Sequence, residues 1–113
     1  MNIDKILIIL GEPNSIFSEI LAKFLVSNKF RIIKKKIILI GNIDLFYDQT
    51  KKLGYHLNIN QINLLKESKL KKINFINIKY NYKKTFEKIS NKSNNYIENC
   101  FNKAIDLSKL NND

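Results

Sequence analysis

Two unbroken apolar runs stand out in the first part of the chain. Lys5–Leu10 reads KILIIL and ends at Gly11, and Ile37–Ile40 reads IILI and ends at Gly41. Runs of this kind, without polar alternation and rich in β-branched residues, are typical of strands covered on both faces in a parallel sheet. The sequence therefore predicts two such strands, each followed by a glycine turn.

A helical pattern follows the first strand. Ile16, Ile20 and Phe24 recur every four residues, flanked by Phe17, Leu21 and Leu25, which predicts a helix. Ser15 is placed to cap its amino end, and we expect the helix to end near Asn28.

The second strand also leads into a helix. Asn42 can cap it, the pattern runs from Ile43 to about Leu53, and Gly54 stands at the C′ position. Strand, helix, strand and helix joined by short turns indicate βαβ winding, and hence a parallel sheet.

The second half of the chain predicts shorter elements. His56–Ile59 predicts a third strand, and Ile73–Ile78 predicts a fourth, whose partial alternation favours a place near a sheet edge. Gln61–Leu65 is predicted to form a short helical turn. A last helix is expected after Ser90. Its predicted apolar stripe consists of Tyr96, Ile97, Cys100, Phe101, Ala104, Ile105 and Leu107.

These elements predict an α/β fold: an open three-layer, Rossmann-like arrangement around a mostly parallel sheet. A crossover helix normally feeds another parallel strand, and the sequence shows none after the last helix. We therefore expect residues 1–113 to form a single partial α/β domain.

Composition narrows the protein class. The chain is 44% hydrophobic, which supports a folded domain, but no apolar run approaches the roughly 20 residues of a membrane span. The amino terminus lacks the pattern of a secretory signal, so a cytoplasmic protein is expected. Cys100 is the single cysteine, so this sequence can form neither an internal disulfide nor a multi-cysteine zinc site.

The net charge of +10 raises the question of a nucleic-acid partner. Arg31 is the only arginine, although arginine is the residue best suited to reading bases and gripping phosphates. Ile, Lys and Asn make up about half of the chain, as expected for an AT-rich genome. We therefore favour a compositional origin of the charge and treat a small basic nucleic-acid-binding module as an alternative.

The turn between the first strand and the first helix is where open α/β sheets place ligands. Its candidate cleft residues are Gly11, Glu12, Pro13, Asn14 and Ser15. Amide groups at the helix start could hold an anion. The turn has neither the dinucleotide-binding glycine pattern nor a P-loop, so spacing alone favours an ordinary strand-to-helix turn.

Other reactive residues are isolated. His56, the only histidine, is expected at the surface, and Cys100 is expected to be a buried hydrophobic residue. The Tyr80–Lys84 cluster could stack bases between cations, but a solvated loop with two partly buried tyrosines is favoured. One histidine cannot build a catalytic triad without a dedicated motif, so no catalytic or metal-ligating residue is assigned.

A resemblance is carried by the residues GEPNSIFSEI that follow the first strand. They are similar to the motif G-D-P-A-G-I-G-P-E-I of the 4-hydroxythreonine-4-phosphate dehydrogenase family of pyridoxal phosphate biosynthesis. The matching residues are Gly11, Pro13, Ile16, Glu19 and Ile20. Glu12 stands at the family aspartate, and Ser15, Phe17 and Ser18 replace its later glycines and proline.

Two further segments resemble the same family. Ile37–Leu57 is similar to its next strand, turn and helix, and Asn94–Leu107 to a helix that precedes another core strand. The resemblance spans nearly the whole chain but only about the first third of a family member. It implies a fold like that of isocitrate and isopropylmalate dehydrogenases.

The resemblance also implies an activity for the parent enzyme. That enzyme oxidises the secondary alcohol of 4-phosphooxy-L-threonine with NAD(P), with help from a divalent metal, and works as a homodimer. Its metal-binding histidines, its substrate-binding His-Thr pair and its phosphate ligands lie beyond the matched region. We therefore expect this chain alone to be non-catalytic and to hold neither NAD(P) nor metal firmly, which leaves open whether it serves an enzyme.

The resemblance further implies that the partner is the remainder of the enzyme or a complementary polypeptide. A non-catalytic interaction subunit, docking through an open sheet edge, is a second alternative.

Overall fold

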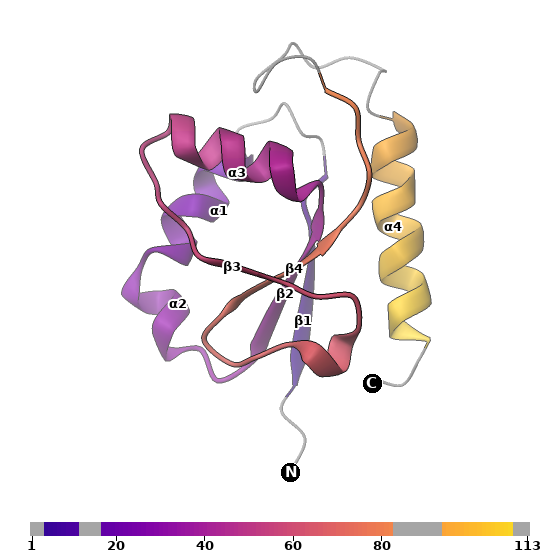
Figure 1. Cartoon of the computed structure of the whole chain (residues 1–113). Coiled ribbons are helices and arrows are strands. Elements are labelled where there is room, and N and C mark those ends of the chain that lie inside the picture. The colour runs from indigo at the N-terminus through magenta and orange to yellow at the C-terminus, as the bar shows by residue number, and fades with distance from the viewer. Residues whose placement is uncertain (1–3, 12–16, 83–93, 110–113) are drawn as a thin grey trace.

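A computed structural model describes residues 4–11, 17–82 and 94–109 of the chain. In these ranges four strands form one sheet, and the helices pack against it (Figure 1). In chain order they are β1 (Lys5–Ile9), α1 (Phe17–Leu25), α2 (Asn28–Ile32), β2 (Lys36–Gly41), α3 (Ile43–Lys52), β3 (Ile59–Gln61), the 3₁₀ turn η1 (Leu65–Glu67), β4 (Ile73–Asn77) and α4 (Asn94–Ser108).

All four strands of the sheet are parallel, and their order is β1-β2-β4-β3. Ile6 pairs with Ile37, and Leu39 pairs with Phe75. The prediction that the fourth strand lies near an edge is wrong, because β4 is paired on both sides. That pairing buries Ile73–Ile76, and the alternation seen in the sequence does not reflect a solvent-facing side.

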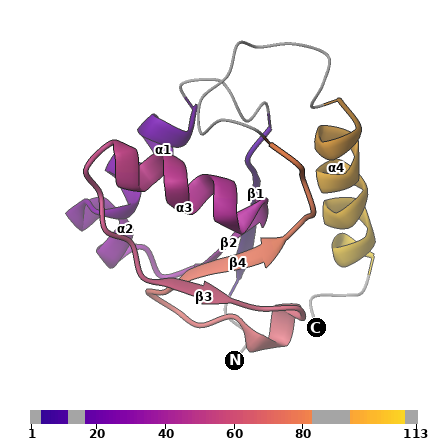
Figure 2. The same ribbon diagram turned by 45° about the horizontal axis from the view of Figure 1, so that its top comes forward.

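Helices cover both faces of the sheet, which confirms the three-layer prediction. Figures 1 and 2 show α1, α2 and α3 on one face and α4 on the other, where Leu65 of the short turn η1 joins the same core. α4 packs on β1 and β2, and α1 packs on α3. No described helix combines the length and apolar character that a bilayer span requires.

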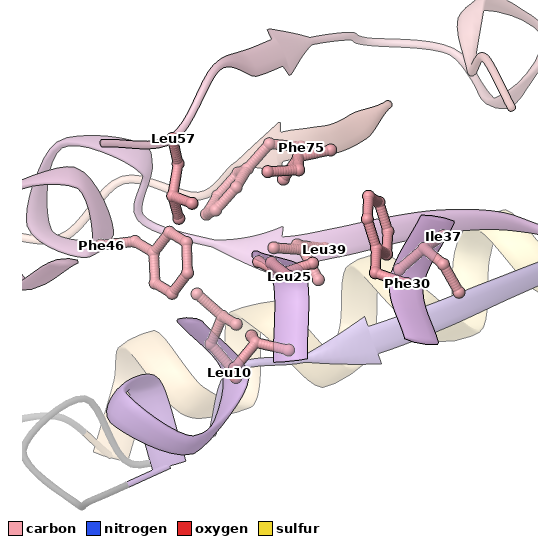
Figure 3. Close-up of a cluster of buried hydrophobic side chains, with 10 residues drawn as sticks. Leu10, Leu25, Phe30, Ile37, Leu39, Phe46, Leu57 and Phe75 are labelled. Carbon is pink, nitrogen blue, oxygen red and sulfur yellow. The ribbon is translucent and has the colours of Figure 1, made fainter. Parts of the chain in front are cut away.

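The core on the α1–α3 side is built from alternate strand residues. Ile37 and Leu39 of β2 and Phe75 of β4 point to this face and meet Phe46 of α3 and Leu25 of α1 (Figure 3). The rings of Phe46 and Phe75 have centroids 5.6 Å apart. This period-two placement of side chains lets a continuous apolar strand feed two cores.

The other alternate residues feed the core beneath α4. Ile38 and Ile40 are fully buried there against Tyr96 and Cys100 of α4. Leu65 of η1 closes the same cluster near the β3 side.

α3 forms as the sequence predicts. The Asn42 side-chain oxygen accepts a hydrogen bond of 2.9 Å from the Leu45 amide, so Asn42 is the N-cap. Gly54 follows the C-cap Leu53 with φ of +89°, a left-handed conformation that glycine adopts without strain.

Several boundaries differ from the prediction. The segment before α1, including the expected cap Ser15, lies outside the described residues, as does Ser90 before α4. The short helix α2 was not predicted. β3 lies later than His56–Ile59, because only Ile59–Gln61 reaches pairing distance of β4. η1 likewise lies later than the predicted turn at Gln61–Leu65.

The predicted apolar stripes are only partly buried. Ile20 of α1 is 55% exposed, and the buried line of that helix contains Ser18 and Leu21 instead. In α4, Phe101 is 50% and Ile105 is 49% exposed. Both helices form as predicted, but their apolar residues extend beyond those that the sheet buries. The helices touch the sheet along a narrower line than their apolar residues cover.

Candidate functional site

A small cavity lies where β1 and β2 end. Its polar lining consists of Ser18, Asn42, Gln49 and Tyr96. Its apolar lining consists of Leu10, Phe17, Leu45 and Phe46. The carboxyl ends of neighbouring parallel strands are the usual place for ligands in open α/β sheets.

The predicted cleft turn begins at the same edge. Gly11 has φ of +68°, which an L-residue with a side chain rarely adopts, so glycine is required for the turn to start this way. The remaining candidates Glu12, Pro13, Asn14 and Ser15 lie outside the described residues.

Asn42 joins the carboxyl end of β2 to two distant segments. Its side-chain nitrogen donates a hydrogen bond of 2.9 Å to the Ile78 carbonyl. Its backbone amide donates one of 2.7 Å to the Tyr96 hydroxyl. The Ile43 amide donates to the Asn77 side-chain oxygen at 2.9 Å. The start of α3, the exit of β4 and the first turn of α4 are therefore fixed to one another.

Gly41 allows this close approach. A Cβ at position 41 would lie 2.5 Å from Leu10 Cδ1 and 2.9 Å from the Tyr96 hydroxyl oxygen. Both distances are shorter than any relaxed contact, so a side chain here would displace the Tyr96 hydroxyl or the end of β1.

Ser18 supplies a hydrogen-bonding group with no protein partner in the described ranges. Its side chain lies in the first described turn of α1 and is 9% exposed, and its Oγ makes no hydrogen bond there. A buried hydroxyl without a partner costs about 1–3 kcal/mol, which a water or ligand atom would recover.

The cavity itself suits a very small guest. Its volume of about 10 Å³ for the centre of a water-sized sphere corresponds to roughly one water molecule. Ser18, Asn42 and Gln49 are neutral, and burial raises the pKa of Tyr96 well above its usual range. The described lining can therefore donate and accept hydrogen bonds but offers no general base at neutral pH.

Tyr80 and Tyr82 of the predicted Tyr80–Lys84 cluster make contacts within the protein. The Tyr80 ring stacks on Tyr96 with centroids 4.5 Å apart and on Tyr82 with centroids 6.4 Å apart. The Tyr82 hydroxyl donates a hydrogen bond of 2.6 Å to the Asp48 carboxylate. This bond raises the pKa of Tyr82 to about 12. The stack ties residues 80–82 to α3 and α4. Lys83 and Lys84 lie outside the described residues.

His56 and Cys100 have the surroundings that the sequence predicts. His56 is exposed in the segment before β3. Cys100 of α4 is fully buried in the core between this helix and the sheet, and burial raises the pKa of its thiol to about 11. A protonated, inaccessible thiol is a packing residue at neutral pH.

The described residues do not fit the metal that the resemblance implies. Within residues 4–11, 17–82 and 94–109, no three histidine, cysteine or acidic side chains come together. The cavity is likewise too small for a nucleotide. No catalytic step through either group is therefore derived from this part of the chain.

Sequence reasoning placed the candidate cleft at the sheet edge where this cavity lies, but it did not anticipate most of the cavity's described lining. Asn42 was expected only as a helix cap and Tyr96 only as core, and neither Ser18 nor Gln49 was expected in the cavity. A small polar residue within an apolar helical stripe, as at Ser18, was the one available signal.

The comparisons with known proteins agree with the fold. No protein-family model matches the chain. No curated protein sequence matches it either. Among solved structures, it is similar to the crystal structure of a 4-hydroxythreonine-4-phosphate dehydrogenase from Burkholderia phymatum, with a TM-score of 0.80 and 16% sequence identity.

That similarity covers 99% of this chain and 34% of the dehydrogenase. This chain thus spans about a third of the length of the enzyme that it matches. At this identity the likeness establishes the fold, and it falls on the same family that the GEPNSIFSEI motif resembles. The molecule therefore has the architecture of part of a 4-hydroxythreonine-4-phosphate dehydrogenase.

Proposed function

We propose that this chain is the amino-terminal sheet unit of a 4-hydroxythreonine-4-phosphate dehydrogenase-like oxidoreductase and acts with the remainder of the enzyme or a complementary polypeptide. The observation that carries the proposal is the match of nearly the whole chain to a third of such an enzyme. In this proposal residues 1–113 form one partial domain, and the reaction is the NAD(P)-linked oxidation of 4-phosphooxy-L-threonine in pyridoxal phosphate biosynthesis.

The division of labour follows from the described residues. They contain no cluster of three side chains that could ligate a divalent metal, and the cavity at the ends of β1 and β2 offers only neutral hydrogen-bonding groups. We therefore assign the metal ligands, the acid–base groups and the phosphate-binding residues to the remainder of the enzyme or the complementary polypeptide. In the complete enzyme, NAD(P) would serve as the hydride acceptor and the metal as a Lewis acid, and no described residue of this chain is assigned to hold either group.

This chain contributes the carboxyl edge of its sheet. Gly11 begins the turn there, and Glu12, Pro13, Asn14 and Ser15 are proposed to line the substrate or cofactor cleft. The buried Ser18 hydroxyl supports a role for this edge, because it is a polar group for which no described residue is a partner.

The experiment is a complementation assay. The DNA beyond codon 113 is translated in all three frames, and the adjoining reading frame is co-expressed with a tagged form of this chain. NAD(P)H formation from 4-phosphooxy-L-threonine and a divalent metal is then measured. The proposal predicts activity for the purified complex and none for the tagged chain alone. A stable complex without activity, or turnover by this chain alone, contradicts it.

A further inference from the structure

The two edges of the sheet differ in sequence and length. β3 at one edge has three residues, reads INQ and is largely polar, as is usual for a strand exposed at an edge. β1 at the other edge has five residues, reads KILII and has the apolar pattern of an interior strand. Its residues are only half-buried, whereas Ile37–Ile40 of β2 are at most 3% exposed.

The hydrogen bonds of β1 show which backbone groups face outward. The Leu10 amide donates to the Ile40 carbonyl, and the Lys36 amide donates to the Asp4 carbonyl, each at 3.0 Å. Even-numbered residues of this strand therefore face β2, so the amides and carbonyls of Leu7 and Ile9 face the outer edge. The described part of the chain places no strand there.

α4 carries apolar side chains toward that same edge. Its buried line is Tyr96, Cys100 and Leu107. Next to this line runs an apolar flank, defined by Ile97, Phe101 and Ala104, whereas the opposite flank holds Asn99, Lys103 and Asp106.

The handedness of the helix fixes the direction of the apolar flank. Seen from the amino end of α4, successive residues of a right-handed helix turn clockwise by about 100°. α4 runs antiparallel to the strands and lies over β1 and β2 (Figures 1 and 2). The flank therefore projects past β1, over the space beside its outer edge.

Chain topology leads to the same place. Parallel strands joined by a helix are connected with a right-handed crossover in nearly all proteins. A right-handed crossover from β4 through α4 on this face leads toward the β1 side of the sheet. The positions next to β4 on that side are already occupied by β2 and β1. The next parallel strand of the architecture therefore belongs at the outer edge of β1.

We propose that the outer edge of β1, together with the apolar flank of α4, receives a parallel apolar strand from the part of the enzyme that this chain does not span. This inference rests on the proposed function, because the matched dehydrogenase is about three times as long as this chain. The net charge of +10 opposes pairing with a second copy and favours a partner of net acidic charge.

The first test supplies the strand within the same molecule. A second copy of the Lys36–Gly41 sequence is joined to the carboxyl end through a linker of about six residues, within the usual range for such connections. Amide hydrogen exchange is measured by NMR. The Leu7 and Ile9 amides are expected to gain about tenfold protection, independent of protein concentration, while Ile6 and Ile8 are already protected by β2.

The second test supplies the strand as a separate peptide with a glutamate tail. The same rise at Leu7 and Ile9 during titration supports docking from a separate chain. Protection that occurs only in the tethered protein means that the strand pairs when it is joined to this chain, whereas the absence of a gain in protection in both forms overturns the proposal. Protection in the unextended protein that grows with its own concentration identifies a second copy as the occupant and also overturns it.

Matched variants separate edge pairing from folding. Leu7→Pro removes an outward amide without removing a bond to β2, and Leu7→Ala is its control with the amide kept. Phe101→Glu is expected to weaken peptide binding at least tenfold, and Ile32→Glu, on a residue 73% exposed in α2, to leave it unchanged. Equal binding by Phe101→Glu and Ile32→Glu contradicts a role for the flank.

The readout is amide exchange and not turnover. If the chain accepts the strand but gives no dehydrogenase activity in the complementation assay, the strand-docking inference stands and the proposed function is contradicted. Activity in the complementation assay without protection of the Leu7 and Ile9 amides supports the proposed function and contradicts the strand-docking inference.

Discussion

Asn42 is the residue on which the site edge depends most. Its side-chain oxygen caps α3 through Leu45, and its side-chain nitrogen holds the Ile78 carbonyl. Both groups are buried or nearly so, and their removal leaves an amide and a carbonyl without their partners.

We predict that Asn42→Ala lowers the free energy of unfolding by about 2 kcal/mol, roughly one for the cap and one for the bond to Ile78. Asn42→Ser is the matched control. The serine keeps an oxygen that can cap α3 and loses only the hydrogen bond to the Ile78 carbonyl, so about half of the loss in unfolding free energy is expected. Urea unfolding measures both, and equal losses in the two variants would show that the cap contributes nothing.

Tyr82 gives the protein a pH dependence in the alkaline range. The hydrogen bond to Asp48 raises the pKa of Tyr82 from 10.0 to about 12, so the folded state holds this proton more tightly than the unfolded chain. The contribution of the contact is therefore fully present below pH 10 and is lost as the pH rises toward 12.

The measurement is an ultraviolet titration of tyrosine ionisation. In Asp48→Asn, one tyrosine is expected to titrate closer to its ordinary value, while the buried Tyr96 stays shifted upward because desolvation raises its pKa. Identical titration curves for the two proteins contradict the assigned contact.

At the scale of residues, only the local part of the site could be predicted. Asn42 follows Gly41 at the start of a helical pattern, so its cap role is visible in the sequence. Its other contacts reach Ile78 and Tyr96, which lie 36 and 54 positions away. Side-chain spacing along one segment carries no information about such pairs.

At the scale of elements, β4 illustrates a different limit. Its partial alternation suggested an edge, yet it lies between β2 and β3, and Asn74 within it is fully buried. The Asn74 side chain donates to the Ile37 carbonyl and accepts from Asn60 and from the Lys69 amide. A polar residue in a strand pattern can therefore be an internal connector as well as a solvent-facing position.

The central place of β4 predicts a large loss for Phe75→Ala. Phe75 is fully buried against Phe46, so a loss of about 3–5 kcal/mol in unfolding free energy is expected. Leu64→Ala, on a residue 49% exposed near η1, is expected to change it by less than about 0.5 kcal/mol. Chemical denaturation compares the two. Similar losses would contradict the burial of Phe75 in the core.

The helices follow the sequence where capping residues are present and depart from it where tertiary contact decides. α3 has its cap and its terminal glycine, and it begins at the predicted residue. In α1 and α4 the apolar pattern is broader than the contact with the sheet. Ile20, Phe101 and Ile105 remain exposed for that reason.

At the scale of the whole molecule, short-range patterns were sufficient for the fold class. Continuous strands, short turns and intervening helices indicate a parallel α/β sheet, and the match to part of a solved dehydrogenase agrees. The strand order was not predictable, because it depends on which strands meet across long sequence separations. The asymmetry of the two sheet edges became visible only with that order.

The central claim is that β1 is an interior-type strand whose outer edge is available for pairing. The most direct measurement is amide hydrogen exchange of the unmodified protein at low concentration. We predict alternation along β1, with Ile6 and Ile8 protected and Leu7 and Ile9 exchanging much faster, beside continuous protection along β2. Equal protection of Leu7 and Ile8 in the monomer would contradict the claim, because the edge would already be occupied.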